Sequence, residues 1–470
     1  MPPGSAKTIE LLRIGNPWLV GQHVNRVVPV FAAHNVIAPD FSRSRSLQSI
    51  KDLAFDAGLA IRESLGPCLQ VHTEDYRDLQ ETTFGLLAPE RRIFQDHRKG
   101  GASEQGSLFP LVGGLTAPAA SDDGLGKRLR ELLLRHRSDW QRKLLELMAP
   151  SVVRDPATAF AARLLGGTSG ESNPEEMPRR SLVLRGIDKA CAEFVDNLLD
   201  LEPCDSRVPA IRRFAMGAYF VGVLRMVAGV VTDVGEELPQ VFVYCGLPPG
   251  VGNDPLVRAA SKSFNRWIAA SHSATARQIH ARLKETPVLP RTRKAERLRQ
   301  QVRTLLGERL GEQQLDATMT GLARIVEGKE LSEEWARRAI DSRTLGFSKS
   351  EYARRVRSLG ANIGFAGPDR GRMPRLMLDT PLLGVLAQGI VGRGSLPYED
   401  FVTRLSERFG LVTGIGSDDT IADRVGDLGS EGYDPYEVLQ RNQELLRERM
   451  VRTGLARTYS DSHTEVFGHA

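Results

Sequence analysis

Basic side chains are concentrated in the middle of the chain, where they could bind phosphate groups. Residues 254–310 hold 13 basic and 4 acidic residues, a net charge of +9, although the whole 470-residue chain carries only +5. Arginine and lysine bind phosphates through charge-assisted hydrogen bonds, and clusters of them are typical of nucleic-acid binding. A solvated basic helix and a surface for an acidic protein are the alternatives. We predict nucleic-acid contacts, to DNA in preference to RNA, at Arg291, Arg293, Lys294, Arg297, Arg299 and Arg303.

A pair of predicted helices over residues 332–359 offers a second basic surface. Ser332 caps the first helix, and a capping box that begins at Ser348 starts the second, which ends at Gly360. Two helices joined by a short turn are common as packing units and are also the frame of a helix-turn-helix. The second helix carries side chains of the types that contact phosphates and bases. The predicted contacts are Lys349, Arg354, Arg355 and Arg357.

A glycine-rich loop follows a predicted strand over residues 241–245 and precedes a predicted helix that begins at Asp254 and Pro255. Free backbone N–H groups at such a helix end can bind a phosphate. The loop lacks the Lys-Ser/Thr pair of a P-loop and the spacing of a dinucleotide fingerprint, and the Asp254 carboxylate opposes an anion. A structural turn is therefore the main interpretation. The residues of the alternative ligand site are Gly246, Gly250, Gly252 and Asn253.

No pattern typical of a catalytic or metal site is found in the sequence. The four cysteines are Cys68, Cys191, Cys204 and Cys245. They form no CxxC pair, so buried thiols in a reducing compartment are expected. The acidic residues Asp233, Glu236 and Glu237 are interpreted as an exposed turn. We assign no catalytic residue, no metal ligand and no cofactor, and favour a non-enzymatic protein.

Length and composition indicate a mainly α, multidomain, globular protein. Hydrophobic residues make up 41% and charged residues 26% of the chain, and 470 residues exceed one ordinary core. Apolar spacing predicts helices over residues 127–149, 187–201 and 208–231. We expect a small mixed α/β region over residues 1–98, a linker over 99–126, a central helical domain over 127–290, a basic region over 291–375 and a C-terminal domain over 376–470.

The segment from Phe214 to Val231 is apolar enough to raise the question of a membrane span. Arg225 lies inside it, and an arginine within a membrane is costly. A buried helix of the central domain is therefore expected. The chain begins without the pattern of a signal peptide, and a cytoplasmic location is predicted.

The C-terminal residues 376–470 have the most regular pattern in the chain. Helices are predicted over residues 382–391, 398–409 and 435–453, and a hairpin with strands over 455–459 and 463–467. Helix, helix, helix and hairpin is the order of a winged helix, and this region resembles that superfamily. The resemblance implies a domain that binds DNA or docks on a protein.

The charge of the C-terminal region favours protein docking over DNA binding. It carries 9 basic and 15 acidic residues, a net charge of −6. Asp434 and Glu437 lie at the start of the third predicted helix, where negative charge opposes phosphates. We therefore assign a protein partner to this region and the nucleic-acid contacts to residues 254–359. The oligomeric state is left open.

These predictions favour a nucleic-acid-associated accessory or assembly protein. Large helical proteins of this type often serve as accessory subunits in prokaryotic multi-gene systems, phage defence among them. One alternative is an enzyme that binds a nucleotide or another phosphate ligand at residues 246–254. Another is a protein-docking scaffold with no nucleic-acid contact.

Overall fold

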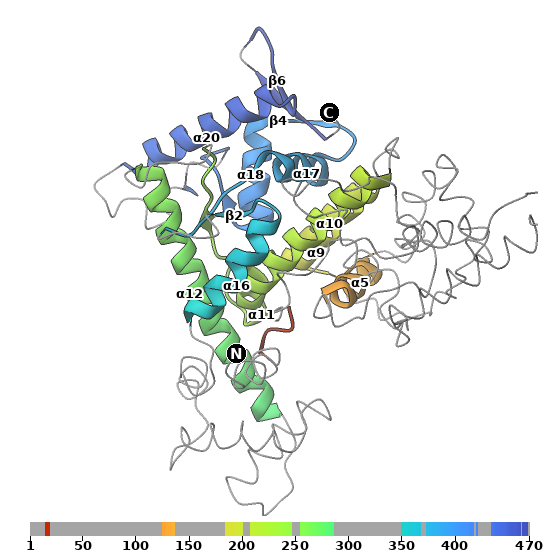
Figure 1. The fold of residues 1–470 in the computed structure, drawn as a ribbon, viewed down its shortest axis with the longest axis vertical. Coiled ribbons are helices and arrows are strands. Elements are labelled where there is room, and N and C mark those ends of the chain that lie inside the picture. Colours follow the sequence, from red (N-terminus) through yellow and green to blue (C-terminus); the bar gives the residue numbers. More distant parts are fainter. Residues whose placement is uncertain are drawn as a thin grey trace, which may run out of the picture. The chain divides into compact units, whose positions relative to one another are not determined.

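The computed structural model of the chain is mainly α-helical (Figure 1). It describes residues 15–18, 125–136, 184–200, 207–246, 254–285, 349–367, 373–417, 420–421, 434–461 and 463–468. The contacts of the chain divide it into two compact units. The first unit consists of residues 1–25, 185–191 and 220–470, and the second of residues 26–184 and 192–219. The predicted N-terminal α/β region and the linker that follows lie almost wholly outside the described residues.

In the second unit, helix α5 (Leu125–His136) forms the start of the helix predicted over residues 127–149, whose remainder lies outside the described residues. Its apolar side chains Leu129 and Leu133 are buried, as their spacing predicts. The Nε2 atom of His136 lies 3.7 Å from the carboxylate of Asp196 on α9 (Gly186–Leu199). The apolar side of α5 therefore forms part of a core.

Helix α10 (Arg207–Leu224) continues through a π-helical turn (Arg225–Gly229) into α11 (Val230–Asp233). The helix predicted over residues 208–231 is thus present. It contains a π turn that the apolar pattern does not predict. Among the described residues, one helical stretch, Met216–Asp233, is long and apolar enough to cross a membrane, and 83% of it is buried inside the structure.

The π turn leaves backbone carbonyl groups that other segments satisfy, because its N–H groups bond one residue further back than in an α-helix. The Tyr352 hydroxyl donates to the Met226 carbonyl (2.6 Å). The Asn16 amide donates to the same carbonyl (2.7 Å) and to the Tyr352 hydroxyl (2.8 Å). The Ser271 hydroxyl donates to the Val227 carbonyl (2.9 Å). These bonds tie residues of α12 (Pro255–Glu285) and α16 (Lys349–Asn362) to the turn.

Arg225 opens the π turn and is only 6% exposed. Its Nε atom lies 3.0 Å from the Asp188 carboxylate, and its Nη2 atom lies 3.2 Å from that of Asp233. Its guanidinium also lies over the Trp18 ring, 5.5 Å from the centroid. A Cβ atom at Gly229 would collide with this guanidinium, so glycine provides the space for it. Two carboxylates and an aromatic face therefore compensate the burial of the charge.

Strand β1 (Val241–Phe242) lies within the buried strand predicted over residues 241–245. Strand β5 (Leu411–Val412) pairs with it in parallel on one side. On the other side, Tyr244 forms a parallel bridge with Met377, directly after β3 (Arg375–Leu376). Strand β3 in turn pairs antiparallel with β2 (Ala366–Gly367). Strand β5 was not predicted.

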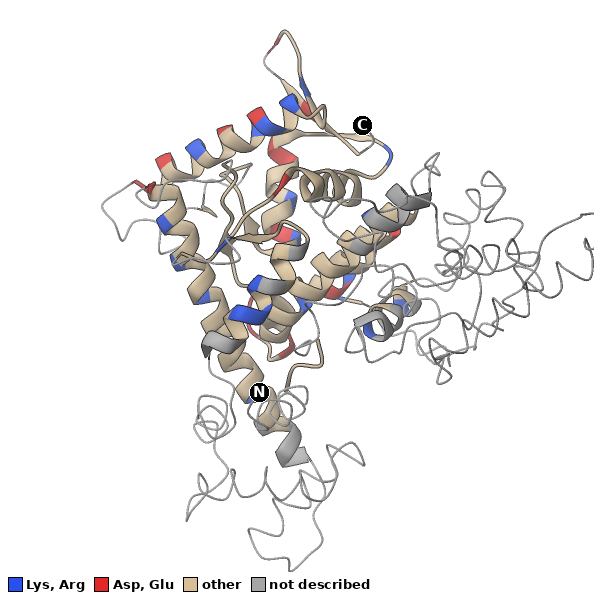
Figure 2. Ribbon diagram, viewed as in Figure 1, with Lys and Arg blue, Asp and Glu red and all other residues tan. Residues whose placement is uncertain are grey.

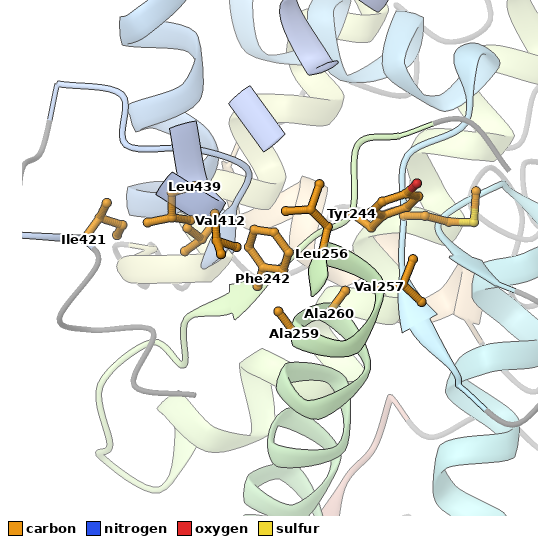
Figure 3. Packing of buried hydrophobic residues seen from close by; sticks show 11 residues of the cluster. Phe242, Tyr244, Leu256, Val257, Ala259, Ala260, Val412, Ile421 and Leu439 are labelled. Carbon is orange, nitrogen blue, oxygen red and sulfur yellow. The ribbon is translucent and has the colours of Figure 1, made fainter. Parts of the chain in front are cut away.

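One hydrophobic core joins β1 to elements that lie far apart in the sequence. Phe242 of β1 packs among Leu256 of α12, Val412 of β5 and Leu439 of α20 (Pro435–Arg452), as Figure 3 shows. Full burial of a side chain of this size contributes about 1.5–3 kcal/mol. The C-terminal elements and α12 therefore stabilise each other through β1.

The helices and the hairpin predicted in the C-terminal region are present, with ends that agree within about two residues. In chain order they are α17 (Thr380–Val391), β4 (Ser395–Pro397), α18 (Tyr398–Phe409), α20, β6 (Ala456–Thr458) and β7 (Thr464–Phe467). The three strands form an antiparallel sheet in the order β4-β7-β6. Asp379 and Asp434 cap α17 and α20, because their carboxylates accept from the backbone N–H groups of Leu382 and Tyr436, each at 2.9 Å.

Helix α16 continues to Asn362, so the prediction that Gly360 ends it is wrong. A Cβ atom at Gly360 would press against Ala366 of β2, which explains why a glycine lies inside the helix. The chain turns instead at Gly364, whose φ of 71° favours glycine. The first helix of the predicted helix-turn-helix lies outside the described residues.

Helix α20 is fixed to the chain that follows β1 by two buried polar side chains. The Asn442 amide donates to the carbonyls of Val243 (2.9 Å) and Thr413 (2.8 Å), and its oxygen accepts from the Cys245 N–H (2.9 Å). The Nη1 atom of Arg449 donates to the Cys245 carbonyl (2.8 Å). Asn442 thus bonds three buried backbone groups, and no other side chain of α20 bonds these three groups.

We expect Asn442→Ala to lower the free energy of unfolding by about 3 kcal/mol or more, because each buried backbone group left without its partner costs about 1–3 kcal/mol. The measurement is urea unfolding followed by circular dichroism. Gln440→Ala, on the exposed side of the same helix, is the control and should change the value by less than about 0.5 kcal/mol. Equal effects of the two substitutions would contradict the role given to Asn442.

We expect Tyr352→Phe and Asn16→Ala each to cost about 1–2 kcal/mol of stability, because both side chains bond the Met226 carbonyl in the π turn. The two residues also bond each other, so their effects should be coupled by more than about 0.5 kcal/mol in a double-mutant cycle. The cycle is measured by thermal or urea unfolding of the full chain. Additive effects would mean that the two residues act independently.

Candidate nucleic-acid interface

Three basic residues, Arg258, Lys262 and Arg266, recur every four residues along α12. Lys262 and Arg266 are exposed and Arg258 is half-buried, whereas Leu256 and Phe264 on other sides of the helix are buried. Side chains four residues apart lie on one side of a helix, at steps of about 6 Å along its axis. We call these three residues the α12 basic stripe. Basic residues follow one another along α12 in Figure 2.

The positive charge of α12 is not offset by carboxylates on the same helix. Residues 254–285 contain six basic and two acidic residues, a net charge of +4, and the two acidic residues lie at the ends, Asp254 and Glu285. Arg277 forms an ion pair with Glu236 in the turn after α11. Over residues 255–284 the sequence of α12 therefore contains basic residues and no acidic ones.

Three of the predicted contact residues, Arg354, Arg355 and Arg357, have side chains in the described part of the chain. In α16, Arg354 is exposed and Arg357 is half-buried, and this helix packs against α12. Arg355 is 6% exposed, so its guanidinium is not available to a phosphate and we leave it out of the interface. The side chain of Lys349 lies outside the described part of the chain. So do the remaining predicted contacts, Arg291, Arg293, Lys294, Arg297, Arg299 and Arg303.

Arg258, Lys262 and Arg266 were not among the named contact residues, although they lie within residues 254–359, to which nucleic-acid contacts were assigned. The prediction favoured residues 291–303 because basic residues are densest there. The signal in α12 is the four-residue spacing of Arg258, Lys262 and Arg266, combined with the absence of acidic residues from 255–284. Spacing, in addition to density, identifies basic residues that share one side of a helix.

Of the alternative ligand site, Gly246 is described, and Gly250, Gly252 and Asn253 lie outside the described residues. A Cβ atom at Gly246 would collide with the Tyr244 hydroxyl, so close packing accounts for that glycine. The predicted helix start is confirmed, since the Asp254 carboxylate accepts from the Leu256 N–H (3.0 Å). One N–H at the helix end is thus already bonded to an anionic group of the protein.

Two further polar side chains, Tyr244 and Arg375, lie near the described ends of this segment, Gly246 and Asp254. The Arg375 guanidinium stacks on the Tyr244 ring, 5.2 Å from its centroid, and is 6% exposed. Burial raises the pKa of Tyr244, and the charge of Asp254 raises it further. The phenol therefore stays protonated at neutral pH, and the pair is suited to packing more than to binding an incoming phosphate.

Helix α20 presents a different surface from α12. Its exposed side carries acidic and basic residues in alternation, visible as red and blue bands in Figure 2. Two pairs are already joined within the helix, Glu444 with Arg447 (2.6 Å) and Glu448 with Arg452 (3.4 Å). Charges balanced in this way give little attraction for a phosphate backbone.

The described residues hold no group of three histidine, cysteine or acidic side chains that could bind a metal ion. Cys191 and Cys245 are free, buried thiols, and burial raises the pKa of each to about 12. Asp233 ends α11, and Glu236 and Glu237 follow the turn after it. All three are exposed, as predicted, and the first two pair with Arg225 and Arg277. Among the described residues, these groups are used for structure.

No known protein family, curated protein or solved structure matches this chain. The functional assignment therefore depends on the charges, the contacts and the order of the elements in the chain itself.

We expect Cys191 and Cys245 to resist thiol reagents in the folded protein. With a pKa of about 12, only about one in 10,000 of these thiols is ionised at pH 8, and both are buried. The double variant Cys68→Ser, Cys204→Ser leaves these two as the remaining cysteines. Reaction with Ellman's reagent should be slow in buffer and should reveal both thiols in denaturant. Rapid labelling in buffer would contradict their burial.

Proposed function

We propose that this protein is a non-enzymatic, nucleic-acid-associated accessory protein that contacts phosphates through the α12 basic stripe. The observation that carries the proposal is the four-residue spacing of Arg258, Lys262 and Arg266 on a helix whose residues 255–284 include no carboxylate. The exposed Arg354 lies on α16, a helix packed against α12, and is a further basic side chain of this part of the chain.

A line of basic side chains suits a nucleic-acid backbone better than a compact anion. The stripe spans nine residues, with about 12 Å of helix axis between the first and the last, whereas a single phosphate group is reached by side chains that converge on one point. Each strand of duplex DNA carries one charge per about 3.4 Å of axis, so a linear stripe can follow one strand. Such contacts position a protein without reading bases. We therefore assign affinity, and no sequence preference, to the stripe.

We further propose that the C-terminal elements form a winged-helix-like domain. Three helices with a strand after the first, a hairpin after the third, and the strand order β4-β7-β6 support this assignment. Helix α20 then occupies the place of the helix that enters a DNA groove in helix-turn-helix proteins. Because its exposed charges are balanced and the region has a net charge of −6, we propose that it docks on protein.

A protein with one surface for phosphates and another for protein can hold a partner on nucleic acid. We propose such an assembly role for this chain, in the cytoplasm, within a prokaryotic multi-gene system such as phage defence. DNA is the preferred nucleic acid, because the predicted helix-turn-helix and the winged-helix-like order are frames used for DNA. Catalysis is assigned to the partner.

The test is the salt dependence of binding to duplex DNA. Neutralising the stripe with Arg258→Gln, Lys262→Gln and Arg266→Gln should weaken binding and reduce the slope of log K against log salt by about three, since each phosphate that is no longer neutralised lowers the slope by about one. Fluorescence anisotropy of a labelled duplex across a salt series measures both quantities.

The matched control removes three positive charges from the C-terminal region instead, with Arg404→Gln, Arg408→Gln and Arg457→Gln. Arg457 lies on β6, in the hairpin that would be the wing, and the other two lie on α18. We expect the control to keep the slope of the native protein within about one. Binding that is abolished in the control and kept in the stripe variant would move the interface to the wing. Binding that is indifferent to salt would overturn the phosphate proposal.

A further inference from the structure

Acidic and basic residues alternate along the exposed side of α20. Along the helix they are Glu437, Arg441, Glu444, Arg447, Glu448 and Arg452. Five of these residues are exposed, and Arg447 is half-buried with 39% of its side chain accessible. At about 100° per residue all six fall within one arc, opposite the buried positions Asn442 and Leu446.

This order is self-complementary when two copies of the helix run antiparallel. With a two-fold axis near residue 445, Glu437 faces Arg452, Arg441 faces Glu448, and Glu444 faces Arg447 of the other copy. Every pair joins opposite charges, and each occurs twice by symmetry. A parallel pairing in register instead places like charges together. The sequence of charges therefore selects both the partner helix and its direction.

Exposed apolar side chains lie near each end of the charged side of α20. The large hydrophobic residues that are exposed among the described residues are Tyr436, Val451 and Tyr459, with 41%, 38% and 39% of their surface accessible. The first two lie on the charged side of α20, and Tyr459 lies in the hairpin directly after it. In the antiparallel pairing, Val451 of one copy falls within about one turn of Tyr436 of the other. Apolar burial then adds to the charge pairing.

We propose that α20 is a dimer interface that pairs antiparallel with α20 of a second copy of this chain. A second copy of the chain is then the partner of the protein-docking surface proposed above, and this proposal rests on that docking role. An acidic or a basic partner fits poorly, because the exposed charges of α20 are three of each sign. The second copy supplies the complementary order without any other protein.

The expected dimer is weak and concentration-dependent. The charged stretch from residue 437 to residue 452 is about 22 Å long, and a single pair of helices buries less than a standard interface of about 1,600 Å². The charges are exposed to solvent, so added salt weakens them. We expect a dissociation constant in the micromolar range that rises with ionic strength.

The test is a charge exchange across the two-fold axis, followed by sedimentation velocity of the full chain from about 1 µM to about 100 µM. Glu444→Arg places two arginines opposite each other in a homodimer, and Arg447→Glu places two glutamates opposite each other. Each variant alone should dimerise at least about tenfold more weakly than the native protein. An equimolar mixture of the two restores opposite charges and should form the heterodimer.

Recovery in the mixture separates the pairing from a folding defect, since a misfolded variant cannot be rescued by the other. Native protein that stays monomeric at about 100 µM and low salt overturns the dimer, as do single variants that associate like the native chain. These outcomes leave the phosphate proposal standing, because the salt slope of DNA binding depends on Arg258, Lys262 and Arg266. If the native protein dimerises as expected but its DNA binding does not depend on salt, the phosphate proposal alone is overturned.

Discussion

The packing of the first unit depends on hydrogen bonds to the backbone N–H and C=O groups of one short buried strand. Residues 241–245 run through an apolar core, where an unpaired N–H or C=O group costs about 1–3 kcal/mol. Strand β5 pairs on one side and the chain after β3 on the other, and Asn442 and Arg449 of α20 complete the set at Val243 and Cys245. Strand β5 and helix α20 are therefore fixed to a strand that precedes them by more than a hundred residues.

A second constraint, the π turn at Arg225–Gly229, fixes the inner side of α12 and α16. Its carbonyls are bonded by Ser271 of α12, Tyr352 of α16 and Asn16, while Phe242 and Leu256 hold α12 at its other end. A helix anchored along its buried side presents its exposed side chains in fixed positions, which is what a binding surface requires. The basic stripe of α12 thus lies on an element whose orientation the two polar networks determine.

Sequence reasoning predicted the elements that carry strong local signals. The helices predicted to begin at Asp254 and Asp434 are present, and so is the strand predicted over residues 463–467. Strand β5 was missed because two residues after a helix have no period of their own, and β1 gives them their conformation. Gly360 was taken for a helix end because glycine is common there, whereas contact with Ala366 requires it. The burial of Arg355 beside the exposed Arg354 follows from which side of α16 packs, and a run of basic residues does not specify that.

The two proposed surfaces have consequences for each other. A two-fold pair of α20 helices places two copies of the α12 basic stripe in one particle, since both helices belong to the same unit. Once the first stripe is on DNA, the second binds at the effective concentration set by the dimer, so the pair binds more tightly than one stripe without any new contact. Symmetric proteins of this kind engage two sites at a fixed separation along the duplex. In the proposed dimer, the acidic C-terminal region would promote DNA binding without touching the phosphates, which is compatible with its net charge of −6.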